Sequence, residues 1–176
     1  LGLLLSGVIC CQDASTEGDT GYFSDWGIGP FQKVDPANPV LLPDESSTFF
    51  CPVRDDTVYW ESKDVFNPAS VVRNDTLFLL YRAEDSVGRF NGTSRIGLAY
   101  STDGLQFTRL PEPVLYPEND FMKPYEWEGG LEDPRIIEDK NGVYYLTYTA
   151  YDGNTARLCV ATSRNLRHWN KQGLAF

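Results

Sequence analysis

The sequence predicts an all-β protein that forms part of a β-propeller. Short runs of β-branched and aromatic residues alternate with turn residues, and a unit of about four strands occurs more than once. No window of 11 or more residues follows the period of about 3.6 residues that is typical of an amphipathic helix. Aromatic residues make up 14% of the 176 residues, and such side chains suit the half-buried surface of a sheet.

Eight strands are expected after about residue 66, each ended by turn chemistry. Asn-Asp at 74–75, Asp-Gly at 103–104, Asn-Gly at 141–142 and Asp-Gly at 152–153 tolerate the backbone angles that tight turns require. The expected strands are residues 69–72, 77–81, 95–100, 107–110, 135–138, 143–149, 157–161 and 169–171.

The chain also repeats itself. Residues 67–72 align with 133–138, residues 77–81 with 144–148, and residues 96–101 with 158–163. Residues 31–34 and 38–43 resemble 107–110 and 112–117, which indicates the outer strand of a third copy. Four strands are the content of one propeller blade. Two blades and one outer strand cannot close a ring, so we expect the N-terminal portion of a propeller, an incomplete ring.

The N-terminal residues favour export. Residues 1–11 are apolar or small, too few to span a bilayer as a helix, which needs about 20, but typical of the end of a signal peptide. We therefore expect a periplasmic or cell-surface protein of a bacterium. Its expected membrane contact is a lipid anchor at Cys10 or Cys11. Residues 12–30 are expected to be a linker and residues 31–176 the partial propeller with the catalytic site.

Charge and cysteine content exclude several classes of function. The formal net charge of −10 disfavours nucleic acid and anionic membrane surfaces, since both would be repelled. Cys51 and Cys159 lack the spacing of a metal site, and independent buried thiols are favoured over a disulfide. No metal or cofactor is expected, because the Asp-rich segments do not have calcium-loop spacing.

The repeat predicts where a site would form. The first strand of each blade lines the channel of a propeller, and here a polar residue followed by proline precedes each such strand, Asn67-Pro68 and Asp133-Pro134. Proline restricts its own backbone and that of the preceding residue, so both polar side chains should have defined directions. Equivalent positions of adjacent blades converge on the axis. Asn67 and Asp133 are therefore expected to share one pocket.

Other residues near these positions suit a sugar. Trp127 offers an apolar face, Gly129 and Gly130 permit a close backbone approach, and Glu132, Arg82 and Arg95 add charged groups. Carboxylates and guanidinium groups together satisfy hydroxyls as acceptors and donors. An oligosaccharide is the expected partner.

Glu132-Asp133-Pro134-Arg135, together with residues 66–69, 81–83, 94–99 and 129–130, resembles the glycoside hydrolases of family 130 over residues 31–176. These are five-bladed propellers that include mannoside phosphorylases and β-mannosidases. The resemblance implies that Asp133 is the acid of an inverting reaction, relaying its proton through a mannose hydroxyl. It also implies that Asn67 and Arg82 hold the mannose, with Arg95 and Glu132 as further pocket residues.

Three functions stay open at this point. Inverting hydrolysis needs an acid and a base about 6.5–9.5 Å apart, whereas phosphorolysis needs only the acid because inorganic phosphate, as co-substrate, is the nucleophile. By resemblance, the residues that separate these reactions lie beyond Phe176. Export favours hydrolysis of β-linked mannosides, because a sugar phosphate formed outside the cytoplasm would be hard to recover. The alternatives are a β-mannoside phosphorylase and a carbohydrate-binding lipoprotein without catalysis.

Overall fold

The computed structural model describes residues 32–176, and its contacts divide the chain into Leu1–Lys33 and Val34–Phe176. All described strands lie in the second part. The predicted signal segment, the Cys10 or Cys11 anchor and the linker at 12–30 lie outside the described residues. No helix of residues 32–176 is long and apolar enough to cross a membrane.

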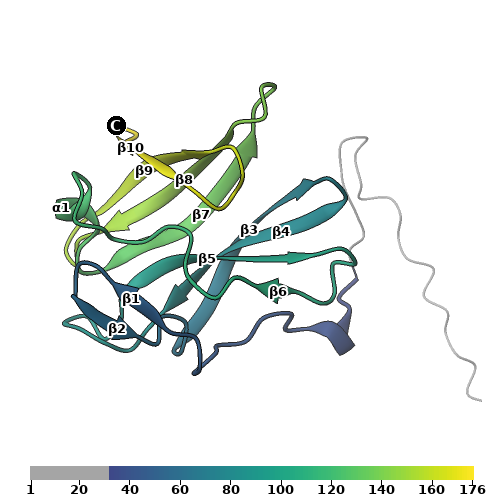
Figure 1. Cartoon of the computed structure of the whole chain (residues 1–176), viewed down its shortest axis with the longest axis horizontal. Helices are drawn as coiled ribbons and strands as arrows, with labels where there is room; N and C mark the ends of the chain where they lie inside the picture. Colours follow the sequence, from purple (N-terminus) through teal and green to yellow (C-terminus); the bar gives the residue numbers. More distant parts are fainter. Residues whose placement is uncertain (1–31) are drawn as a thin grey trace, which may run out of the picture. The chain divides into compact units, whose positions relative to one another are not determined.

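The prediction of an all-β fold is confirmed. Ten strands are present among residues 32–176, beside one short helix, α1 (Lys123–Glu126), and a 3-10 turn, η2 (Asp35–Ala37). The first repeat consists of β3 (Asp64–Arg73), β4 (Thr76–Glu84), β5 (Ser94–Ser101) and β6 (Thr108–Arg109). The second repeat consists of β7 (Gly130–Glu138), β8 (Tyr144–Tyr151), β9 (Ala156–Ser163) and β10 (Asn170–Leu174). All eight predicted strands are present, and Figure 1 shows the two repeats beside each other.

Each repeat is an antiparallel meander, and one parallel pair joins them. Ser94 of β5 pairs with Gly130 of β7, which links the two meanders into one eight-stranded sheet. Gly130 has φ +104°, and a Cβ there would lie 2.1 Å from the backbone oxygen of Ser94. The glycine therefore lets two strand backbones approach closely, and the approach of a ligand to Gly129 and Gly130 stays a prediction. The described sheet is open, so the number of blades stays a prediction.

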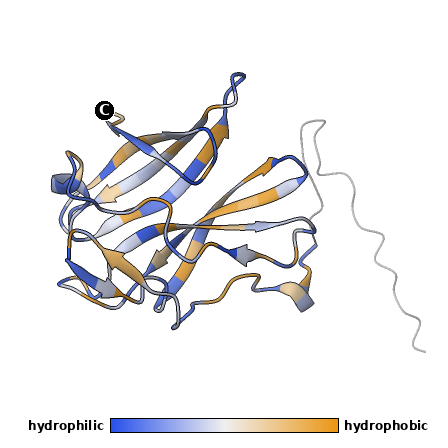
Figure 2. Cartoon of the chain, in the orientation of Figure 1, coloured by the Kyte–Doolittle hydropathy of each residue, from blue (hydrophilic) through white to orange (hydrophobic). Residues whose placement is uncertain are grey.

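Two hydrophobic cores cover the two faces of the first repeat. Alternate residues of β4 and β5 point to opposite faces, as the period of two in a strand requires. Leu80, Ile96 and Leu98 face the first core, which Leu146 and Tyr148 of the second repeat complete. Hydrophilic colours dominate the turn between β7 and β8 in Figure 2, as expected for an exposed turn.

The second core contains residues that the strand pattern did not reveal. It lies under a hairpin of β1 (Phe49–Cys51) and β2 (Asp56–Val58), whose strands are too short to show a period. Tyr81 and Ala83 face this core from β4. Residues 32–34, where an outer strand was expected, form no strand, and Phe31 lies outside the described residues. Cys51 and Cys159 are buried free thiols, as favoured from the sequence.

Candidate active site

Equivalent irregularities in β3 and β7 present Asn67 and Asp133. The register of β3 with β4 shifts between Phe66 and Ala69, and that of β7 with β8 shifts between Glu132 and Arg135. Asn67 has φ 45° and Asp133 has φ 49°, in the left-handed region that Asn and Asp tolerate better than most residues. A bulge of this kind turns a side chain out of the normal alternation of the strand.

The two side chains meet, as the repeat predicts. Asn67 Nδ2 donates a hydrogen bond of 2.7 Å to Asp133 Oδ1. Asp133 is 39% exposed at its side chain, and Asn67 is also exposed, so both remain open to a ligand. An amide and a carboxylate from different repeats thus form one polar pair.

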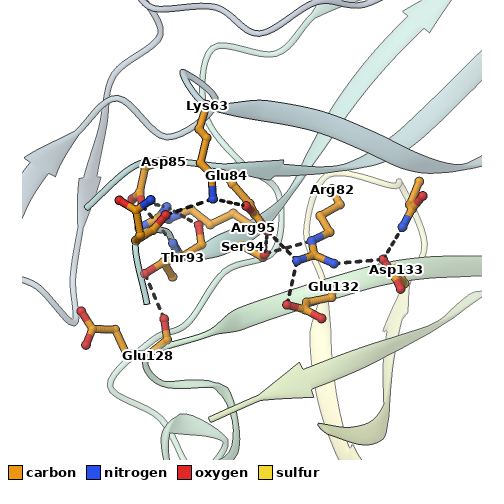
Figure 3. A network of polar contacts seen from close by, with 12 residues as sticks. Lys63, Arg82, Glu84, Asp85, Thr93, Ser94, Arg95, Glu128, Glu132 and Asp133 are labelled. Atoms are coloured by element: carbon orange, nitrogen blue, oxygen red, sulfur yellow. Dashed lines mark hydrogen bonds and ion pairs between the residues drawn. The ribbon is translucent and has the colours of Figure 1, made fainter. Parts of the chain in front are cut away.

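Arg82, on β4, is the centre of the cluster (Figure 3). Its Nη1 donates to Asp133 Oδ1 at 3.3 Å, and its Nη2 donates to Glu132 Oε1 at 2.8 Å and to Glu84 Oε1 at 2.5 Å. Its Nε donates to Ser94 Oγ at 3.0 Å. One guanidinium therefore joins three carboxylates and a hydroxyl from three strands, β4, β5 and β7.

An aromatic ring packs against this guanidinium. The ring centroid of Phe66 lies 4.5 Å from Arg82 Cζ, within the range of a cation–π contact. Since Phe66 directly precedes Asn67, the same turn of β3 supplies both the amide and the ring. The side chain of Arg82 is only 15% exposed.

The carboxylates of the cluster differ in their proton affinity. Burial raises the pKa of Glu132; the charge of Arg82 opposes this, and the charges of Asp133 and Glu84 add to it. Burial also acts to raise the pKa of Glu84, but hydrogen bonds from Lys63, Arg82 and Ser94 outweigh it, so this pKa is lowered. Glu84 is thus the more firmly ionised of the two.

Arg95 does not join this cluster, contrary to the prediction of a pocket residue. Its side chain is 0% exposed, and its Nη1 bonds Asp85 Oδ2 at 2.8 Å and the backbone oxygen of Thr93 at 3.0 Å. Arg95 pairs with Ala83 in the register of β4 and β5, whereas Glu84 pairs with Ser94. Arg95 therefore points to the opposite face from Arg82, where it stabilises a buried ion pair.

Trp127 contacts protein groups in this structure. Its side chain packs against the core under the β1–β2 hairpin, and the guanidinium of Arg54 lies 5.2 Å from the ring centroid. Arg54 in turn pairs with Glu128 at 2.6 Å. The predicted sugar-stacking role of Trp127 stays a prediction.

Glu84 and Ser94 are the site residues that sequence reasoning missed. A period of two could have found Glu84, because Arg82 and Glu84 lie on the same face of one strand. Ser94 lies directly opposite Glu84 in the register of β4 and β5, and its hydroxyl donates to Glu84 Oε1 at 2.9 Å. Ser94 could have been identified only from the pairing of β4 with β5, which a single sequence does not reveal.

The arrangement can hold a carboxyl group in one orientation and let it transfer a proton. Oδ1 of Asp133 accepts two hydrogen bonds, and Oδ2 accepts none from the part of the chain that the structure describes. Within residues 32–176, no group of three or more His, Cys, Asp or Glu side chains is placed to hold a metal ion.

Comparison with known proteins supports a specific family. A family model described as beta-1,4-mannooligosaccharide phosphorylase, of glycoside hydrolase family 130, matches residues 39–176. A 1,2-beta-oligomannan phosphorylase of Thermoanaerobacter sp. (strain X514) is 38% identical over 123 residues, which is 65% of this chain and 39% of that protein. A beta-1,2-mannobiose phosphorylase of the same organism is 34% identical over 122 residues, 62% of this chain and 38% of that protein.

Solved structures agree with this match. One comes from work reporting that the GH130 family of mannoside phosphorylases contains glycoside hydrolases that target beta-1,2 mannosidic linkages in Candida mannan. It superposes with a TM-score of 0.83 at 48% identity, over 88% of this chain and 44% of that one. A glycosyl hydrolase from Bacteroides ovatus gives the same values. The chain spans about two fifths of the length of the curated relatives. With a family model that matches residues 39–176, the chain belongs to glycoside hydrolase family 130.

Proposed function

We propose that the whole protein cleaves β-linked mannosides with Asp133 as the acid. The observation that carries the proposal is the asymmetry of this carboxyl group: Asn67 and Arg82 bond Oδ1, while Oδ2 is left for a proton and a ligand. Two donors on Oδ1 keep the proton off that oxygen. The proton then resides on Oδ2 and passes to the substrate, directly or through a mannose hydroxyl.

Asn67 and Arg82 are proposed to hold the mannose in the cleavage subsite. Each of them already fixes the acid, so a sugar bound to both would be aligned with Oδ2. The exposed side chain of Asn67 retains its amide oxygen as an acceptor for a hydroxyl. Glu132 is proposed to act beside them through Arg82, which it bonds at 2.8 Å.

Phosphate is the acceptor that we propose first. We expected hydrolysis as the main reaction, but the family description and both curated relatives are named as phosphorylases, which favours the alternative. Phosphorolysis also needs only one carboxyl catalyst. The product would be mannose 1-phosphate. Arg82 is occupied by three carboxylates, so the phosphate would need cations other than Arg82.

Hydrolysis is the second candidate, and one comparison favours it. The structure at 48% identity comes from work on glycoside hydrolases that target beta-1,2 mannosidic linkages. The two curated relatives also carry β-1,2 names, so we propose β-1,2-mannosides as the first substrates to test. Export, if the N-terminal prediction holds, would also suit hydrolysis. A carbohydrate-binding protein without catalysis is the remaining alternative.

The test uses the full-length protein with β-1,2- and β-1,4-mannobiose, each with and without inorganic phosphate. Mannose 1-phosphate formed only with phosphate supports phosphorolysis, and free mannose at equal rates in both conditions supports hydrolysis. Asp133→Asn should lower kcat by about 10³-fold or more while the substrate still binds, because it removes the proton donor. Unchanged turnover in this variant contradicts the proposal. Binding without turnover in the wild type supports the non-catalytic alternative.

A further inference from the structure

The guanidinium of Arg82 is held from the side opposite to Asp133. Glu84 Oε1 accepts from Arg82 Nη2, and Ser94 Oγ accepts from Arg82 Nε at 3.0 Å. Ser94 also donates to Glu84 Oε1 at 2.9 Å, so the three groups form a closed ring of hydrogen bonds. The side chains of Glu84 and Arg82 are 12% and 15% exposed, which limits competition from water.

We propose that Glu84, supported by Ser94, is a positioning residue for catalysis that acts through Arg82. This inference rests on the proposed function. Asp133 and Glu132 both attract the same guanidinium, and Asp133 receives the longest of its bonds, 3.3 Å. Glu84 draws the guanidinium away from Asp133. The acid is therefore oriented by Arg82 without being locked into a tight ion pair with it.

The role of Glu84 depends on its charge, which neighbouring contacts maintain. Lys63 Nζ donates to Glu84 Oε2 at 3.0 Å, so the two oxygens of Glu84 have separate partners. A carboxylate with bonds on both oxygens has little freedom to rotate. Glutamine at this position could still accept from Arg82, but it would place its NH2 group beside Lys63, and it would lack the negative charge that competes with Glu132 and Asp133 for Arg82.

The opposite view is that Glu84 is only a stabilising ion pair. That view predicts a lower free energy of unfolding for Glu84→Gln with no specific effect on turnover. Positioning predicts a loss in kcat that exceeds any change in KM, because a catalytic group displaced by about 1 Å can cost about 10²-fold in rate. The two views therefore differ in kinetics rather than in stability.

A double-mutant cycle in the full-length protein distinguishes them. We expect Glu84→Gln to lower kcat by about 10²-fold in the wild type. In an Arg82→Lys background the same change should cost less than about 3-fold, since Lys cannot make the paired contacts. Ser94→Ala, which removes the Nε acceptor, should show the same dependence on Arg82. Equal losses in both backgrounds would overturn the inference.

Glu61→Gln is the matched control. Glu61 pairs with Arg109 at 2.7 Å and is 0% exposed, but it does not contact Arg82. We expect this variant to lose stability and to keep its kcat within about 3-fold. A loss in kcat as large as that of Glu84→Gln would mean that any lost ion pair impairs the enzyme, which contradicts a specific role.

If the proposed function fails, a structural experiment still tests the positioning role of Glu84. If the wild type cleaves no mannoside with either phosphate or water, the proposed reaction is wrong. The positioning of Arg82 is then tested by crystal structures of the wild type and of Glu84→Gln. A guanidinium that keeps its contacts with Ser94 and Asp133 in the variant would overturn the inference, and a displaced one would support it.

Discussion

Replacing Asn67 separates the two properties that this residue combines: its amide group and its left-handed backbone. The amide donates to Asp133 Oδ1 at 2.7 Å. The proposed acid becomes charged as it gives up its proton in the transition state. A hydrogen bond to a charged group contributes about 1.5–3 kcal/mol, and the 39% exposure of Asp133 argues for the lower end. Loss of about 1.5 kcal/mol of transition-state stabilisation corresponds to about a 10-fold fall in kcat/KM. Both Asn67→Gly and Asn67→Ala should show at least this fall.

Asn67→Gly and Asn67→Ala should differ in their free energy of unfolding. Glycine adopts φ 45° without a steric penalty, whereas alanine in the left-handed region costs about 1–2 kcal/mol. We therefore expect Asn67→Ala to unfold at lower denaturant concentration than Asn67→Gly, although their kcat/KM values are similar. Steady-state kinetics and equilibrium denaturation of the full-length protein measure the two effects.

Asn74 provides the control for this experiment. Its φ is 48°, nearly that of Asn67, but it lies in the turn between β3 and β4. Asn74→Ala should lose stability relative to Asn74→Gly, and both should keep wild-type kcat/KM. Wild-type kcat/KM in Asn67→Gly would refute the assignment of a role to the amide.

Two further predictions concern stability. Gly130→Ala should destabilise the protein by about 2–6 kcal/mol, since φ +104° disfavours a side chain and the new Cβ would overlap Ser94. Gly104→Ala, at φ +72° with only Leu77 Cδ2 near the new Cβ, at 3.9 Å, should cost only about 1–2 kcal/mol, and equal losses in denaturation would contradict the close-contact argument. Hydrogen bonds from the backbone of Gln106 and Leu105 and from Ser101 lower the pKa of Asp103 to about 2, so its carboxylate stabilises the fold above pH 3.8 and loses this effect as the pH falls through about 2. Asp103→Asn should therefore melt below the wild type at pH 6 and approach it at pH 2, and a constant difference in Tm across this range would exclude the contribution.

Much of the site could be predicted because the repeat supplies three-dimensional information. Aligning Asn67 with Asp133 was enough to predict that they meet, and the hydrogen bond between them confirms the contact. The bulges were not predicted. Pro68 led us to expect that the strand begins after it, at residue 69, but β3 begins at Asp64 and continues through a shift in register between Phe66 and Ala69.

Other parts of the site depend on pairing that the sequence does not display. The misassignment of Arg95 arose from its place in a matching motif, although the alternation of β5 puts it on the face opposite to Ser94. The contact of Arg82 with Asp133 requires the junction at Gly130, where backbones from residues 36 positions apart come together. The β1–β2 hairpin was missed because strands of three residues carry too little pattern.

Under the proposed function, the division of the cluster between two copies of one motif affects when the protein gains activity during synthesis. Asn67 and Arg82 belong to the copy that leaves the ribosome first, and Asp133 belongs to the one that follows. A nascent chain with only the earlier copy folded would present the amide and guanidinium proposed to hold the sugar, but not the proposed acid. Catalysis would then require the later copy to dock, and a polypeptide arrested before that copy would not cleave glycans.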